Sequence, residues 1–208
     1  MQTPRYWRIR IKVDYTIDFS TTAWDRNEVG IWYGAWSVQD WHAARAENDP
    51  WAMLRELAHQ QALGWDWTPD ISAVRRFEKI GSDDWVVVFL QARNEIGLGR
   101  LVGEMQSDVN HPLNYKGEIF KFKKLIDKKT FRLSKLPAAY RLLPSQGRGN
   151  IHEFHAMRSH VSLLASCNSE EGVETNLSSM TFDDLLNFLG PSAWESISTA
   201  YLIIEHGF

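Results

Sequence analysis

The sequence has a single cysteine, Cys167, and no long run of apolar residues. One thiol cannot form an internal disulfide, so we predict a protein of the reducing cytosol. No apolar run reaches the roughly 18 residues that a membrane-spanning helix needs. The first five residues lack the apolar core of a signal peptide. These absences predict a cytoplasmic location and no membrane partner.

Complete catalytic motifs are also missing. There is no G-x-S-x-G elbow and no Cys/His signature for nucleophilic catalysis. A metal-dependent nuclease needs a carboxylate followed by Glu-x-Lys on the next strand, and the acidic and basic residues at 78–79 and 118–121 have the wrong spacing. We therefore predict that this chain is not an enzyme and uses no cofactor.

Three histidines, His152, His155 and His160, lie close together in the sequence with Glu153. Their H-x2-H-x4-H spacing lacks the helical i, i+4 pair with a nearby carboxylate that is typical of zinc sites. We favour surface or capping roles for these histidines. A small metalloenzyme that uses them as ligands is the alternative.

Charge is divided unevenly along the chain. Residues 116–158 carry 11 basic and 3 acidic residues, a net of +8. Residues 165–208 carry 7 acidic residues and no basic residue. The net charge of −3 hides this division. Segregated charge indicates an oppositely charged partner or a contact between the two segments.

The basic segment alternates lysine with phenylalanine. We predict a hairpin over residues 119–133 that turns at Asp127-Lys128. On such a hairpin Phe120 and Phe122 would face the core, and Lys121 and Lys123 would face outward. A row of outward lysines binds a phosphate backbone without reading its sequence. The alternatives are a solvated sheet face or an edge protected against aggregation.

Two further features favour nucleic-acid contact. In the loop from Pro144 to Asn150, glycines flank Arg148, so the backbone amides and the guanidinium can approach a phosphate or a guanine edge. The aromatic cluster Trp32, Tyr33, Trp36 and Trp41 can stack on an exposed base. A plain flexible turn and a tryptophan-filled core are the respective alternatives.

Short strands with glycine-rich turns dominate the first 135 residues. Alternation predicts a strand over 5–13 with Arg8, Arg10 and Lys12 on a basic outer face, and the runs 29–36, 85–92 and 96–104 predict three more. The expected fold class is α+β, with a small curved sheet or β-barrel, flanking helices and a C-terminal helical segment.

Helices are expected where capping residues precede periodic apolar residues. Ser37 is a predicted N-cap for a helix through Ala46, and Pro50 is suited to the first turn of the next helix. Residues 71–80 are ambiguous between helix and strand. A helix is expected over 154–167, a linker over 168–180 and two short helices over 181–208.

The segment Gly81 to Glu104 resembles the strand pair of PUA-like barrels, the superfamily of EVE, ASCH and YTH domains. The segment Gly117 to Phe154 resembles recognition domains of bacterial restriction-type proteins. The resemblance implies a PUA-like recognition domain over residues 1–167. It also implies that the domain reads a base, because domains of that superfamily are base readers and several of them read modified bases.

The tail, Leu189 to Glu195 followed by Ala200 to Phe208, resembles the opening helix of Mrr-type restriction nuclease domains. On that resemblance Glu195 matches the first-helix glutamate, although a capping box with Ser192 is the explanation that we favour. The strands that carry the catalytic residues would follow Phe208. This interpretation predicts a recognition domain separated from a longer nuclease, or one with a nuclease partner.

Together these observations predict a nucleic-acid-binding module of a restriction or anti-phage system, with DNA favoured over RNA. The alternative is a protein–protein adaptor that uses the acidic tail and the tryptophan-rich surface. The residues expected to contact nucleic acid are Trp32, Trp36, Lys121, Lys123, Arg132, Arg141, Arg148, Asn150 and His152.

Overall fold

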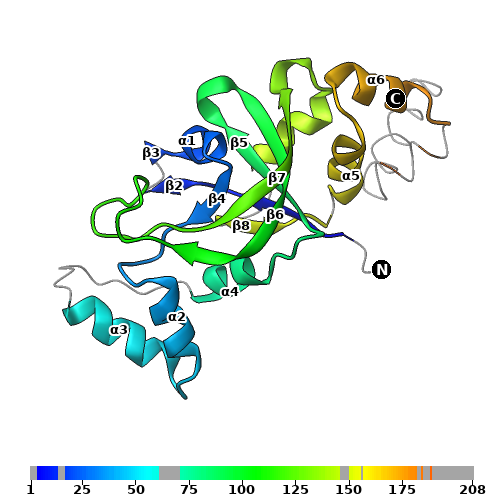
Figure 1. The fold of residues 1–208 in the computed structure, drawn as a ribbon. Helices are drawn as coiled ribbons and strands as arrows, with labels where there is room; N and C mark the ends of the chain where they lie inside the picture. The colour runs from blue at the N-terminus through cyan, green and yellow to red at the C-terminus, as the bar shows by residue number, and fades with distance from the viewer. Residues whose placement is uncertain are drawn as a thin grey trace, which may run out of the picture.

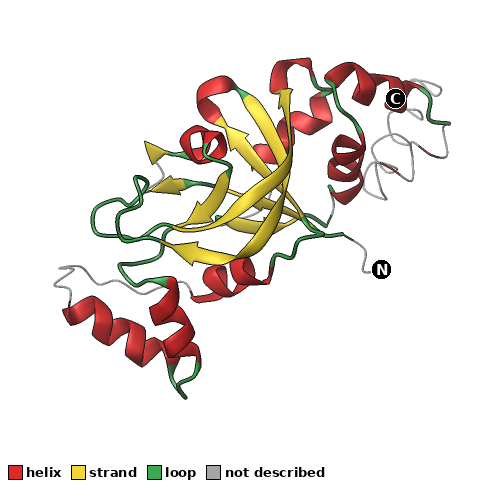
Figure 2. Cartoon of the chain, viewed as in Figure 1, coloured by secondary structure: helices red, strands yellow, loops and turns green. Residues whose placement is uncertain are grey.

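The computed structural model describes residues 4–13, 17–60, 71–145, 150–155 and 157–181, together with residues 184 and 188. A mixed six-stranded sheet forms its centre, with helices on both sides (Figures 1 and 2). The strands of this sheet are β1 (Tyr6–Ile9), β4 (Glu28–Ile31), β5 (Trp85–Leu90), β6 (Glu95–Ser107), β7 (Lys121–Arg132) and β8 (Ile151–Glu153). β2 (Lys12–Val13) and β3 (Ile17–Asp18) form a separate antiparallel pair.

Strand order in the large sheet is β4-β7-β6-β5-β1-β8. β1 is parallel to β5, and the other neighbours are antiparallel. β4 and β8 are the two edges, so the sheet is open. The predicted α+β class with a curved sheet and flanking helices is confirmed, and of the two expected architectures the open sheet is the one observed.

Seventeen elements are described in all, of which six are α-helices and three are 3-10 helices. The α-helices are α1 (Ser20–Asp25), α2 (Val38–Arg45), α3 (Pro50–Gln60), α4 (Ile71–Lys79), α5 (Arg158–Ser166) and α6 (Glu170–Ser178). The 3-10 helices are η1 (Gln91–Arg93), η2 (Leu133–Lys135) and η3 (Ala138–Ser145). The expected N-cap Ser37 is confirmed: its side chain accepts from Asp40 N and its backbone N–H is held by the Asp40 carboxylate.

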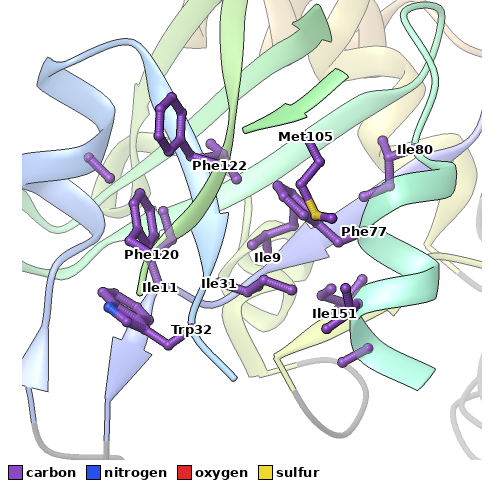
Figure 3. Packing of buried hydrophobic residues seen from close by; sticks show 14 of the residues in the cluster. Ile9, Ile11, Ile31, Trp32, Phe77, Ile80, Met105, Phe120, Phe122 and Ile151 are labelled. Carbon is purple, nitrogen blue, oxygen red and sulfur yellow. The ribbon is translucent and has the colours of Figure 1, made fainter. Parts of the chain in front are cut away.

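The sheet is covered on both faces, which explains the continuous valines of β5. Val86 and Val88 belong to one core, which also contains Phe77 of α4, Ile80 directly after α4 and Met105 of β6 (Figure 3). Val87 points the other way, into a second core that contains Tyr6 and side chains from η3, α5 and α6. Strand alternation thus sends neighbouring residues to two separate cores.

The predicted hairpin at Asp127-Lys128 is wrong. Residues 121–132 form one continuous strand, β7, which pairs along its length with β6. Between the pairs Leu98–Lys129 and Arg100–Ile126 the register shifts by one residue, and Asp127 there has φ 51°. Asp127-Lys128 therefore forms a β-bulge. A bulge favours the same residue types as a turn, but it bends the strand and does not reverse it.

Three further segments differ from expectation or lie outside the described residues. The basic N-terminal run forms β1 and β2, with a break at Arg10 and Ile11. The segment expected as a linker over 168–180 contains α6, whose Val173 is buried in the second core. The tail from 189 to 208, with Glu195, lies outside the described residues, as does Arg148.

The described helices include none that has both the length and the apolar character needed to cross a bilayer.

Candidate nucleic-acid interface

The prediction that Lys121 and Lys123 face outward is wrong. Lys121 is fully buried, and Lys123 is 3% exposed. Phe120 and Phe122 are buried as well, because both faces of β7 are covered at this end of the strand. In their present positions neither ammonium group can contact a phosphate backbone.

Lys121 holds a turn in place. Its Nζ donates to Gly34 O at 2.8 Å and Tyr33 O at 3.2 Å, and lies 3.9 Å from the centroid of the Trp36 ring. Tyr33 and Gly34 have φ values of 102° and 92°, which turn the chain sharply after β4. Burial lowers the pKa of Lys121 well below its ordinary value, against the opposing effect of Glu118 and Asp40.

Lys123 caps the end of α4. Its Nζ donates to Glu78 O at 2.9 Å and to Ile80 O at 2.8 Å. The last carbonyls of a helix have no partner within the helix and carry partial negative charge, so a cation is a suitable donor there. Burial lowers the pKa of Lys123, although Glu78, Asp84 and Glu104 favour its charged form.

The other lysines between 121 and 129 also have acceptors within the chain. Lys124 pairs with the buried Glu28 at 2.7 Å. Lys128 donates to Trp24 O and to Asn27 Oδ1. Lys129 donates to Ala165 O and Cys167 O. Most of the lysine-rich part of the basic block thus serves the fold, and its charge count overstates the cationic surface.

Trp32 and Trp36 belong to the core and do not form an open base pocket. Trp32 is 4% exposed and its Nε1 donates to Leu113 O at 2.8 Å. Trp36 is 1% exposed and stacks on Trp41, with 5.8 Å between the ring centroids. Trp32, Trp36 and Trp41 therefore fit the alternative prediction of a tryptophan-filled core.

A basic cavity of about 280 Å³ lies where β1 meets β2, on the face of the sheet that bears the second core. Three basic side chains and one acidic side chain are among its lining residues, which are Arg8, Ile9, Arg10, Ile11, Lys12, Asp18, Phe89, Pro144 and Ser145. Alternation along the N-terminal run brings the three cations to one side. A cavity so lined attracts an anionic group.

Arg8 and Arg10 form the wall of the basic cavity. Arg8 is buried, and burial together with repulsion from Arg10 lowers its pKa to about 10, so it remains charged at neutral pH. Arg10 donates to Pro144 O at 3.2 Å, which joins β1 to η3. Lys12 donates to Gln91 Oε1 at 2.7 Å, which joins the rim to η1.

Asn150 and His152 lie beside these arginines, as β8 pairs with β1. Asn150 O accepts from Arg10 N at 2.8 Å, and His152 is opposite Arg8 in the register. Burial is the largest cause that lowers the pKa of His152, and the positive charge of Arg8 and of other neighbours lowers it further. The imidazole is therefore neutral at pH 7 and can both donate and accept hydrogen bonds.

Tyr33 is the aromatic residue of the predicted cluster that reaches this region. It is half-buried, and its hydroxyl accepts from Asn150 Nδ2 at 3.2 Å. Alternation predicts Tyr33 on the opposite side from Trp32, but the chain turns at Tyr33, and the Tyr33 ring packs against the same core that contains Trp32. Among the four aromatic residues, Tyr33 is thus the one that can approach a ligand at Asn150.

Further basic residues continue from the cavity along η3 to the end of β7. Arg141 of η3 is exposed and donates to Ser134 O of η2 at 3.4 Å. Arg132 and Lys135 lie on either side of Ser134 and are exposed. We call the set Lys12, Arg10, Arg141, Lys135 and Arg132 the basic track.

Comparison with protein-family models, with curated proteins and with solved structures gave no significant match.

The predicted site residues thus divide into two groups. The structure brings Asn150 and His152 together beside Arg8 and Arg10, with Arg132 and Arg141 at the surface farther along, and it buries Trp32, Trp36, Lys121 and Lys123. Arg8, Arg10 and Lys12 were missing from the predicted contacts. Their signal was the basic face of the N-terminal strand, which alternation had already shown.

The histidine set does not form a metal site. Within the described ranges, no group of three or more His, Cys, Asp or Glu side chains could hold a metal ion. His160 is buried against Tyr140, with 5.4 Å between ring centroids, and burial lowers its pKa. His155, by contrast, is exposed.

Proposed function

We propose that this chain is a nucleic-acid-binding module that binds DNA through the basic track. The observation that carries the proposal is the basic cavity, where Arg8, Arg10 and Lys12 line one hollow, and among the described lining residues only Asp18 is acidic. Arg10 and Lys12 are half-buried and can contact a ligand, whereas Arg8 is 1% exposed and contributes its charge without direct contact. A hollow of this charge favours a ligand with dense negative charge, and a phosphate backbone supplies it.

The basic track provides a path for more than one phosphate. Arg10 is hydrogen-bonded to the end of η3, and Arg141 links η3 to η2, so the elements that carry these cations contact one another in sequence. Arg132 and Lys135 extend the path to the end of β7. Contacts of this kind position a nucleic acid without reading its sequence.

Base recognition on this proposal belongs to Asn150, His152 and Tyr33. An asparagine amide and a neutral imidazole both donate and accept hydrogen bonds, as reading a base edge requires. The half-buried Tyr33, whose hydroxyl is hydrogen-bonded to Asn150, is the aromatic residue nearest to this pair on the proposal, although its ring packs against the first core. The resemblance to recognition domains of restriction-type proteins supports DNA as the ligand and a modified base as its recognised feature.

Fluorescence anisotropy with a labelled 20-base-pair duplex, from 50 to 200 mM salt, tests the proposal. We expect the logarithm of the binding constant to fall linearly with the logarithm of salt concentration. Arg10→Gln, Lys12→Gln and Arg141→Gln should each weaken binding and each reduce the slope by about 0.9, the value for one phosphate contact.

Arg55→Gln is the matched control, because Arg55 is an exposed arginine on α3, away from the basic track in Figure 1. It should leave the slope unchanged. The proposal fails if the duplex does not bind, if binding is independent of salt, or if Arg55→Gln has the same effect as Arg10→Gln. Parallel titrations with single-stranded DNA and RNA decide which nucleic acid is preferred.

A further inference from the structure

We propose that the acidic helix α6 competes with nucleic acid for the Arg132 end of the basic track. This inference rests on the proposed function and concerns its regulation. α6 belongs to the acidic segment 165–208, which has seven acidic residues and no basic one. It lies at the end of β7, on the side of the molecule away from α2 and α3 (Figure 1).

Specific contacts hold the first turn of α6 against the basic block. Glu170 Oε1 accepts from Arg132 N at 2.6 Å. The carboxylate of Glu171 accepts from its own backbone N–H and from Ser169 and lies near Lys135, and together these interactions lower its pKa. Two carboxylates therefore lie next to Arg132 and Lys135, where the proposed track would place phosphates.

The position of α6 is fixed by the fold. Lys129 donates to Ala165 O and Cys167 O and so holds the turn between α5 and α6. Ser169 caps the helix by accepting from Gly172 N at 3.2 Å, and Val173 is buried in the second core. The acidic first turn is thus presented to β7 by packing and by capping, in addition to charge attraction.

A phosphate backbone that extends along the whole track meets like charge at this end. Repulsion between Glu170, Glu171 and phosphate either shortens the bound stretch or requires α6 to move away. By thermodynamic reciprocity, if docked α6 weakens DNA binding, bound DNA weakens the docking of α6 by the same factor.

The double variant Glu170→Gln/Glu171→Gln tests the inference, because an amide keeps the side-chain oxygen as an acceptor and removes the charge. Couplings between sites are typically about 5- to 150-fold, and we expect duplex DNA to bind at least about fivefold more tightly than to the native chain. The salt slope should become steeper by about one or two contacts as Arg132 and Lys135 engage phosphates.

Glu47→Gln/Glu56→Gln is the charge-matched control, since both side chains are exposed on or next to α2 and α3, far from α6 in Figure 1. It should change affinity much less. If both double variants bind DNA equally well, only net charge matters and the inference is overturned, although the proposed function stands. If no variant binds DNA, both proposals are overturned.

Hydrogen exchange supplies a second measurement on the unmodified chain. Adding the same duplex should accelerate exchange of the α6 amides, and exchange in the control helix α2 should be unaffected. Unchanged protection of α6 at saturating DNA would contradict the competition.

Discussion

At the scale of single residues, the strongest constraint on this fold is the close approach of strands and rings to glycine. Gly30 of β4 faces β7, where a β-carbon at position 30 would lie 2.2 Å from Lys121 O and 2.6 Å from the Phe120 ring. Backbone atoms of a central strand cannot move away cheaply. Glycine at this position is therefore a packing requirement.

Gly30→Ala should destabilise the protein by about 3 kcal/mol, since the added methyl group forces the β4–β7 pair apart. Gly81→Ala is the control, because a β-carbon at Gly81 has no heavy atom within 4 Å. Urea unfolding followed by circular dichroism measures both. Equal midpoints for the two variants would contradict this account of Gly30.

The buried lysines show at the same scale why charge alone does not identify a binding surface. Lys121 and Lys123 are basic side chains whose hydrogen-bond partners are main-chain carbonyls in the interior. A cation that satisfies carbonyls of a turn or a helix end stabilises the fold and is unavailable to a ligand. The residue type alone cannot distinguish these buried lysines from the lysines of the basic track. Their contacts in the folded chain do.

At the scale of elements, the bulge at Asp127 shapes the sheet. It bends β7 against β6, and the Asp127 carboxylate accepts from Arg100 Nε at 2.7 Å on the facing strand. A second register shift, between Val102 and Gln106, coincides with Gly103 at φ 74°. These irregularities curve two long strands, so that one sheet can be covered by helices on both faces.

Asp127→Val should destabilise the protein by about 1–2 kcal/mol, because a β-branched residue is strained at positive φ. Asp127→Asn tolerates that conformation and loses only a solvent-exposed ion pair, so its cost should be below about 1 kcal/mol. Equilibrium unfolding of both variants separates the backbone effect from the charge effect. Similar losses for Val and Asn would show that the Arg100 pair dominates.

At the scale of the whole molecule, the charge division has two roles. Much of the basic block binds Glu28 and backbone carbonyls inside the chain, and its exposed end meets the acidic start of α6. The N-terminal strand, which the charge count of the block ignored, supplies the cations of the basic cavity. The proposed binding surface therefore combines residues of the N-terminal strand with residues between positions 132 and 152.

Lys123→Met and Lys135→Met should separate these two roles. Lys123→Met leaves Glu78 O and Ile80 O without this donor, so stability should fall by about 2 kcal/mol while the salt slope of DNA binding stays constant. Lys135→Met, at an exposed position, should leave stability nearly unchanged, and in the Glu170→Gln/Glu171→Gln background, where Lys135 can engage phosphate, it should weaken DNA binding. A reduced slope for Lys123→Met in a folded protein would restore Lys123 to the interface.

The sequence by itself determined most local structure. Val-rich β5, the capped helix α2 and the alternating N-terminal strand follow from propensity, capping and periodicity, which act between near neighbours. It also determined that Arg8, Arg10 and Lys12 share a side.

Only the tertiary structure decided which side of each strand meets solvent. Alternation places Lys121 and Phe122 on opposite sides of β7, but it cannot show that elements distant in the sequence cover both sides. The same limit applies to Asp127-Lys128, whose preference for positive φ suits a turn or a bulge until pairing with β6 selects the bulge. Burial and pairing depend on contacts across the whole chain. Because of these contacts, the candidate site includes the arginines at β1 and excludes the buried lysines of β7.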